Sequence, residues 1–230
     1  MKTKKFDGVA DFDRVAPDLV ALASTFQAAV LCDVAGRRGA LDARIQGLNP
    51  AMKVAGPAFP VECRPGDNLM FHVALALAKP GDVIVADGRA YGASALFGEL
   101  MVTQAAAAEL GGFVVDGAAR DVSVIGHGAF PIFSVGRNPA GPTKSIGGRI
   151  GATISVGGTS VSPGDLIVGD ADGVVAIPRE DVPNVLRAAA AKLEAEATRI
   201  REIEEGVLVS PWLDEALRDA GVIGRQETLL

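Results

Sequence analysis

The chain has 230 residues, a net charge of −6 and 49% hydrophobic residues, with only 5% aromatic residues. A chain of this length can bury one sizeable core, and its hydrophobic content excludes an intrinsically disordered protein. The acidic balance, without a basic cluster beyond residues 2–5, argues against nucleic acid as a partner.

Cysteine content and hydropathy indicate the cellular compartment. Cys32 and Cys63 are too few for a disulfide framework and predict buried thiols in a reducing environment. No uncharged apolar run reaches the roughly 18 residues of a membrane span. Residues 1–7 are basic but lack the apolar stretch of a secretory signal. We therefore expect a cytoplasmic protein that binds neither membranes nor nucleic acids.

Helical and strand-like patterns alternate along most of the chain. The predicted helices are residues 16–40 in two pieces, 68–78, about 98–110, and a long amphipathic helix that follows Asp181 and stops before Gly206. The predicted strands are residues 53–63, 83–86, 113–116, 131–135, 150–156, 166–168 and 174–177. This order predicts an α/β fold with a layered sheet core in one domain.

Prolines and glycines mark the boundaries of these elements. Two prolines within 53–63 predict an edge strand, and residues 88–97 and 136–149 are predicted loops. Pro163-Gly164-Asp165 repeats Pro80-Gly81-Asp82, and an apolar strand follows each, so both segments are predicted to use the same turn.

The strongest functional signal is the spacing between Glu99 and the segment Asp116-Gly117-Ala118-Ala119-Arg120-Asp121. A helix over 98–110 rises roughly 20 Å, and a strand of about five residues after Gly111-Gly112 returns roughly 16 Å. Arg120 and Asp121 should therefore lie near Glu99 at the start of the helix. Two carboxylates, a guanidinium and unpaired helix N–H groups would suit a small anion and a hard metal ion.

Each of these residues also has a purely structural interpretation. Glu99 stabilises a helix N-terminus by charge alone, Arg120 and Asp121 could form an ordinary surface ion pair, and Asp116 could be a turn residue before Gly117. His72 and His127 are the only histidines, which excludes a three-histidine zinc site, and both are predicted to be structural or surface residues.

A family resemblance runs through these motifs. Gly98-Glu99-Leu100, the Gly111-Gly112 stop, the Val-Val-Asp-Gly end of the strand and Arg120-Asp121 resemble the RraA-like family, whose enzymatic branch is the 4-hydroxy-4-methyl-2-oxoglutarate / 4-carboxy-4-hydroxy-2-oxoadipate aldolases. The resemblance extends over roughly residues 25–206 and includes Pro65-Gly66-Asp67-Asn68.

The resemblance implies a fold and an assembly. It implies an α-β-β-α layered sandwich of the swivelling β/β/α type, with one domain over 1–206. A C-terminal extension, 207–230, would pack on the same or a neighbouring subunit. The assembly would be a homotrimer or a hexamer.

The resemblance also implies a class II aldolase that uses Mg²⁺, Mn²⁺ or another divalent cation. Such an enzyme cleaves a small 4-hydroxy-2-oxo acid to pyruvate and a second oxo compound, with oxaloacetate decarboxylation as a side activity. Asp121 would bind the metal. Arg120 would hold the 2-oxo oxygen and stabilise the developing enolate.

Further positions carry over to the start of the helix and to the long C-terminal helix. The substrate carboxylate would lie at Gly98 and at the backbone N–H groups of Leu100 and Met101. Glu99, where the aldolases usually have aspartate, would orient a water in proton transfer. Glu196, or alternatively Glu194, would reach the site of a neighbouring subunit.

Two other functions remain open at this stage. The same family contains non-catalytic proteins that bind and inhibit an RNA-degrading endonuclease. A related lyase or decarboxylase with another substrate is also compatible with the motifs, since a fold does not determine a function. The complete set of carboxylates with Arg120-Asp121 favours an enzyme, because a binding protein would not need it.

Overall fold

The computed structural model describes residues 9–229. The chain divides into two compact units, Met1–Ala189 and Ala190–Leu230. The helices are α1 Pro17–Ala23, α2 Ala28–Val34, α3 Leu69–Leu77, α4 Glu99–Ala107, α5 Val122–Ile125, α6 Val182–Glu204 and α7 Leu213–Asp219, with a 3₁₀ turn at Arg179–Asp181. The strands are β1 Gln46–Gly47, β2 Val54–Glu62, β3 Val83–Phe97, β4 Gly112–Ala119, β5 Ile132–Arg137, β6 Arg149–Ile150, β7 Ile154–Val156, β8 Thr159–Val161, β9 Leu166–Asp170 and β10 Gly173–Ile177.

One large mixed sheet organises the first unit. Its order is β1-β5-β4-β3-β2-β9-β10, with β6 also paired to β2, while β7 and β8 form a separate hairpin. Strands β2 to β5 run parallel to one another, and α3 and α4 connect β2 to β3 and β3 to β4. The remaining pairs are antiparallel.

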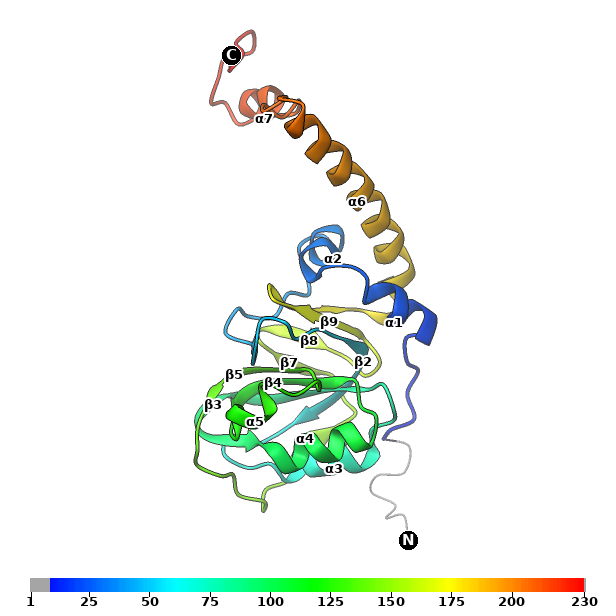
Figure 1. The fold of residues 1–230 in the computed structure, drawn as a ribbon, viewed down its shortest axis with the longest axis vertical. Coiled ribbons are helices and arrows are strands. Elements are labelled where there is room, and N and C mark those ends of the chain that lie inside the picture. Colours follow the sequence, from blue (N-terminus) through cyan, green and yellow to red (C-terminus); the bar gives the residue numbers. More distant parts are fainter. Residues whose placement is uncertain (1–8, 230) are drawn as a thin grey trace. The chain divides into compact units, whose positions relative to one another are not determined.

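The alternation of side chains along β9 and β10 reveals the layers. Ile167 and Val174 join the core that also contains α3, α4 and the parallel strands. Leu166, Val168 and Val175 point to the opposite face and pack in a second core with α2 and the start of α6. In Figure 1, α3 and α4 lie on one side of the strands and α1 and α2 on the other. The predicted α-β-β-α layering is confirmed.

The prediction that residues 53–63 form an edge strand is wrong, because β2 lies between β3 and β9. Pro57 is the last residue of β2 that pairs with β9, and Ala58 is the first that pairs with β3. The Ala58 N–H donates to Asp165 O on the β9 side at 2.7 Å. Because backbone N–H groups alternate along a strand, Pro57 lacks its N–H on the β3 side before β3 begins. The proline therefore removes no ladder hydrogen bond.

β3 and β4 are the strands that most exceed their predicted lengths. β3 continues through the expected loop at 88–97, and three register shifts against β4 accommodate its extra residues. β4 continues through Asp116 and Gly117 to Ala119. Asp116 is therefore a buried strand residue rather than a turn residue, and it forms an ion pair with Arg44 at 2.8 Å.

Three Pro-Gly-Asp turns share one geometry, which confirms the predicted similarity of two of them. Gly66, Gly81 and Gly164 have φ of +75°, +84° and +83°. In each turn the aspartate N–H donates to the carbonyl three residues earlier, at 2.9, 3.0 and 3.2 Å for residues 67, 82 and 165. A proline followed by a glycine with positive φ is typical of a type II turn. All three aspartate side chains are buried.

The long C-terminal helix begins in the first unit. Val182, Val185, Leu186 and Ala189 pack into the second core, as expected for the start of an amphipathic helix. In the second unit, the rest of α6 is followed by Gly206 and the short helix α7. Within residues 9–229 no single helix has the length and apolar character of a membrane span; α1 and α2 reach them only as a pair that is bent by 108°.

The Arg14–Asp82 ion pair generates a stability prediction. Arg14 Nε lies 2.6 Å from Asp82 Oδ1, and the Asp82 side chain is 0% exposed. We expect Arg14→Met to lower the free energy of unfolding by about 3 kcal/mol, because it leaves a buried carboxylate without its partner. Urea unfolding measures this loss. Arg179→Met, whose partner Asp13 is 87% exposed, should cost less than about 1 kcal/mol; equal losses would contradict the explanation.

Candidate functional site

The predicted meeting of Glu99 with Arg120 and Asp121 is present in the structure. The Glu99 N–H, the first of α4, donates to Asp121 Oδ2 at 3.0 Å. Arg120 Nε lies 3.6 Å from the same carboxylate oxygen. The Arg120 N–H donates to Phe97 O at 3.0 Å, which ties the end of β4 to the end of β3. The helix and strand lengths were therefore sufficient to predict this juxtaposition.

Parallel pairing of β3 with β4 is the local cause. The last residues in register are Phe97 and Ala119, so Gly98 and Arg120 leave the sheet side by side. A Cβ on Gly98 would lie 2.4 Å from Asp121 Oδ2 and 2.8 Å from Arg120 Cγ. Since real Cβ atoms do not approach other atoms so closely, a side chain at position 98 would have to displace Asp121 and Arg120.

Asp121 has an unusual backbone conformation. Its φ of 57° and ψ of 30° place it in the left-handed region, which aspartate tolerates better than most residues. The Asp121 carbonyl accepts the N–H groups of Val124 and Ile125, so the residue both ends the turn after β4 and begins α5. Within residues 9–229, Asp121 Oδ1 accepts no hydrogen bond, and the side chain is 41% exposed.

Arg120 lines two cavities. The first, here called the helix pocket, has a volume of about 150 Å³ and is lined by Asn68, His72, Gly98, Leu100, Met101, Arg120, Gly141, Pro142 and Lys144. The second, here called the strand-end pocket, has a volume of about 320 Å³ and is lined by Ala119, Arg120, Asp121, Val122, Arg137, Asn138 and Pro139. Arg120 therefore borders both cavities, and its side chain is 41% exposed.

The helix pocket favours an anionic ligand. It contains the cations Arg120 and Lys144 and the start of α4. Burial lowers the pKa of His72, and Lys144 lowers it further, which favours a neutral imidazole. Asn68 Oδ1 and His72 Nε2 are buried without a hydrogen-bond partner among the described residues. Buried polar atoms normally have partners, so a ligand or water is expected here.

Sequence reasoning missed Asn68 and Lys144 as pocket residues and interpreted His72 as a structural or surface residue. Asn68 belongs to the Pro65-Gly66-Asp67-Asn68 motif, which was noticed only as part of the resemblance. Lys144 lies in the segment predicted as a loop. The sequence signal for this part of the pocket was the Pro65-Gly66 turn followed by the polar residues Asp67 and Asn68.

The two backbone amides that are predicted to bind the substrate carboxylate differ in whether they already have a hydrogen-bond acceptor. The Met101 N–H already donates to Gly98 O at 3.1 Å. The Leu100 N–H has no acceptor within the described part of the chain, although the Leu100 side chain is 83% exposed. Leu100 is therefore the amide that can receive a ligand without losing an existing bond.

The donor set near Asp121 suits a hydrated hard cation. Residues 9–229 contain no group of three or more His, Cys, Asp or Glu side chains arranged to hold a metal. Zinc normally requires at least three protein ligands, whereas Mg²⁺ retains several waters and uses one or two carboxylates. Asp121 Oδ1 fits the second pattern. Glu99 contacts Asp121 through its backbone N–H, while the residue is exposed and lines neither pocket. The metal itself stays a prediction.

The predicted residues of α6 lie in the second unit. Glu196 forms an ion pair with Lys192 at 3.0 Å, one helical turn away. The Glu194 carbonyl accepts a hydrogen bond from the Thr198 hydroxyl at 3.0 Å. The proposed role of either glutamate in a neighbouring subunit stays a prediction.

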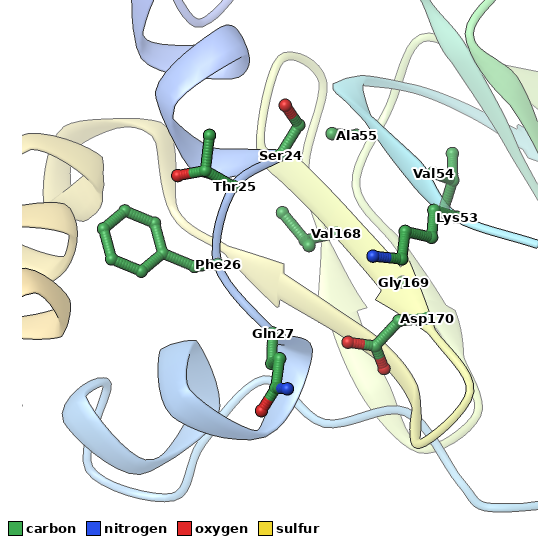
Figure 2. A pocket seen from close by; sticks show the side chains of 10 residues that line it. All are labelled: Ser24, Thr25, Phe26, Gln27, Lys53, Val54, Ala55, Val168, Gly169 and Asp170. Atoms are coloured by element: carbon green, nitrogen blue, oxygen red, sulfur yellow. The ribbon is translucent and has the colours of Figure 1, made fainter. Parts of the chain in front are cut away.

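A further pocket of about 120 Å³ lies beside the connection between α1 and α2 (Figure 2). Its polar side chains include Lys53 and Asp170. The Asp170 carboxylate already accepts the N–H groups of Ala28 at 2.8 Å and Asp172 at 3.0 Å. Its carboxylate therefore has a structural task at the β9–β10 turn, and we place the candidate site at Arg120 and Asp121.

Gly98 generates the prediction of this subsection. We expect Gly98→Ala to displace the Asp121 carboxylate and the Arg120 side chain, and to reduce activity or ligand binding about 100-fold, because a displacement of about 1 Å is enough for such a loss. The matched control is Gly92→Ala, since a Cβ at Gly92 meets nothing within 4 Å. Kinetics and thermal melting of both variants test this; equal effects would contradict it.

Comparisons with known proteins identify a family and a shared fold. The RraA-like family model, described as Aldolase/RraA, matches residues 28–176. A relative from Halalkalibacterium halodurans, named "Putative 4-hydroxy-4-methyl-2-oxoglutarate aldolase", is 42% identical over 168 residues, which cover 73% of this chain and 80% of the relative.

Two solved structures share the fold. An uncharacterized protein from Pseudomonas syringae pv. tomato is 25% identical with a TM-score of 0.74, over 85% of this chain and 96% of that chain. Streptomyces coelicolor RraAS2, described as an unusual member of the RNase ES inhibitor RraA protein family, is also 25% identical with a TM-score of 0.74, over 82% of this chain and 98% of that chain. The chain belongs to the RraA-like family.

Proposed function

We propose that the protein is a divalent-metal-dependent lyase that cleaves a 4-hydroxy-2-oxo acid to pyruvate and a second oxo compound. The observation that carries this proposal is the position of Arg120 and Asp121 at the open start of α4, where cation, carboxylate and free amide converge. The name of the H. halodurans relative supports the same reaction class.

Arg120 supplies the charge that the reaction needs. Arg120 lines both pockets, and its guanidinium would donate to a 2-oxo oxygen. The N–H of Leu100, which has no acceptor among the described residues, would donate to one oxygen of the adjacent carboxylate. Donors that are positioned before the reaction stabilise developing negative charge without reorganisation. These two groups would therefore hold a pyruvyl fragment in one orientation.

The bond changes follow from this orientation. A base removes the proton of the 4-hydroxyl group, the C3–C4 bond breaks, and its electron pair moves onto the 2-oxo oxygen as an enolate. Protonation at C3 then gives pyruvate. Loss of CO₂ from oxaloacetate leaves the same enolate, so the proposal includes oxaloacetate decarboxylation.

Asp121 and Glu99 would provide the remaining chemistry. A divalent cation held by Asp121, with waters completing its shell, would polarise the 2-oxo group as a Lewis acid. Glu99 lies on the exposed side of the first turn of α4, where it can exchange a proton through water. We assign Glu99 this proton-transfer role.

We also propose that the protein is cytoplasmic and assembles as a homotrimer or hexamer. The second unit leaves large apolar side chains of α6 exposed, namely Leu193, Ile200 and Ile203. Such exposure on one helix is typical of a surface that is covered in an assembly. A neighbouring α6 would then bring Glu196 or Glu194 to the site.

The alternative function is a non-catalytic regulator of an RNA-degrading endonuclease. The likeness to RraAS2 favours it. The two functions separate in one comparison: an enzyme releases pyruvate with metal in the absence of any protein partner, whereas a regulator binds and inhibits a purified endonuclease without metal.

Arg120 gives a direct test of the proposed reaction. We expect purified protein with Mg²⁺ to release pyruvate from 4-hydroxy-2-oxo diacids or oxaloacetate, and Arg120→Lys to lower kcat/KM by about 100-fold, because lysine cannot reproduce the planar donor pair. EDTA should abolish release, and added Mg²⁺ or Mn²⁺ should restore it. Arg38→Lys serves as the control, because Arg38 lines a separate cavity with Thr159 and Asp181 and borders neither of the pockets at Arg120. Full activity in Arg120→Lys would refute the assignment.

Glu99 gives a second test. We expect Glu99→Gln to lower kcat by about 100-fold, because the amide cannot transfer a proton, while Glu99→Asp retains most of the activity. Steady-state kinetics over a pH range measures both. If Glu99→Gln is as active as the unchanged protein, Glu99 has only a structural role at the helix start.

A further inference from the structure

The Pro65-Gly66-Asp67-Asn68 turn contacts both walls of the helix pocket. On one side, Asn68 Nδ2 donates to Leu96 O at 2.7 Å, two residues before Gly98. On the other side, the Asp67 carboxylate binds the segment 141–146, which supplies Gly141, Pro142 and Lys144 to the pocket. The proposed reaction uses no residue of this turn.

We propose that Asp67 is a positioning residue that holds segment 141–146 in place and thereby fixes the guanidinium of Arg120. The consequence for substrate rests on the proposed function, whereas the consequence for Arg120 does not.

The Asp67 carboxylate is the centre of the contacts. Its Oδ2 accepts the Thr143 hydroxyl at 2.7 Å, the Ser145 N–H at 2.7 Å and the Ile146 N–H at 3.1 Å, with the Ser145 hydroxyl at 3.5 Å. Its Oδ1 accepts the Leu69 N–H at the start of α3 at 3.0 Å. The residue is only 1% exposed. One carboxylate thus joins a helix start to a loop.

Backbone bonds continue this connection. The Thr143 N–H donates to Gly66 O at 2.8 Å, and the Asn68 N–H donates to Thr143 O at 3.0 Å. Segment 141–146 has few buried side chains of its own, and Ile146 is 48% exposed. With little apolar burial, its position depends mainly on the polar contacts to residues 66–68.

Gly141 transmits this position to Arg120. A Cβ on Gly141 would lie 2.9 Å from Arg120 Nη1, so the loop backbone lies directly against the guanidinium. If the segment moves away, Arg120 loses this wall and the pocket widens. The effect on catalysis would therefore pass through the orientation of Arg120 rather than through contact of Asp67 with substrate.

The charge of Asp67 matters as well as its shape. Desolvation raises the pKa of the carboxyl, but hydrogen bonds from Ser145, Leu69, Thr143 and Ile146 outweigh it and lower the pKa to about 2. The lowered pKa means that the contribution to stability is fully present above the unfolded value of 3.8 and is lost as pH falls through about 2. The contact therefore persists throughout the neutral range.

The other Pro-Gly-Asp turns provide a matched control. Asp165 Oδ2 accepts the Ser162 N–H at 2.8 Å, and its Oδ1 accepts the Arg179 N–H at 3.3 Å. Asp165 is 8% exposed and lines neither pocket. Replacement of Asp165 by asparagine disturbs the same kind of turn without touching segment 141–146.

The test compares Asp67→Asn with Asp165→Asn in the full-length protein. For Asp67→Asn, we expect faster hydrogen exchange in residues 141–146, a shifted Arg120 Nε–H resonance and a KM for the 2-oxo acid raised by about 10-fold, with a smaller change in kcat. For Asp165→Asn, we expect none of these three changes. The Arg120 signal is identified by its loss in Arg120→Lys.

Thr143 keeps the proposal testable if Asp67→Asn does not fold. Thr143→Val removes one donor to Asp67 and should shift the same Arg120 resonance, while Thr143→Ser should restore it. If the unchanged protein releases no pyruvate but the resonance moves only in the Asp67 and Thr143→Val variants, the proposed reaction fails and the positioning role stands. If neither resonance nor KM responds to Asp67→Asn or Thr143→Val, the positioning role is overturned.

Discussion

The parallel pairing of β3 with β4 is the constraint on which the candidate site depends. Because Phe97 and Ala119 are the last residues in register, the two chain segments leave the sheet next to each other. The Asp121 carboxylate then accepts the first free N–H of α4, where the helix dipole favours negative charge. A helix and two strands of suitable length are therefore enough to assemble a cation, a carboxylate and an amide from positions 22 residues apart.

Buried carboxylates hold the surrounding structure together. Asp67, Asp82 and Asp116 each connect segments that are distant in sequence, through Thr143, Arg14 and Arg44 respectively. Such contacts are directional, and removal of Arg14 or Arg44 would leave the buried carboxylate of Asp82 or Asp116 without its opposite charge. With so few aromatic residues available, they specify where the segments around the apolar core are placed.

The site was predictable from the sequence where it depends on local geometry. Glu99, Arg120 and Asp121 are linked by one helix and one strand, whose lengths follow from the residue pattern. Asn68, His72 and Lys144 were not predictable as pocket residues, because the pocket joins α3 to a segment about 75 residues later through the bonds of Asp67. The predicted edge position of β2 is wrong for a related reason. The effect of a proline in a strand depends on whether a neighbouring strand lies on the side where the backbone N–H is missing.

The left-handed backbone of Asp121 has a consequence for how this site can vary among related chains. At φ of 57°, glycine, asparagine and aspartate are the residues that fit with least strain, whereas alanine, glutamate or a β-branched residue would strain the turn. A related chain that lacks this carboxylate would most easily have asparagine or glycine at position 121. Asparagine preserves the shape of the side chain and removes its charge in a single step. The backbone conformation at Asp121 therefore restricts which substitutions could convert a catalytic site on this scaffold into a site that only binds.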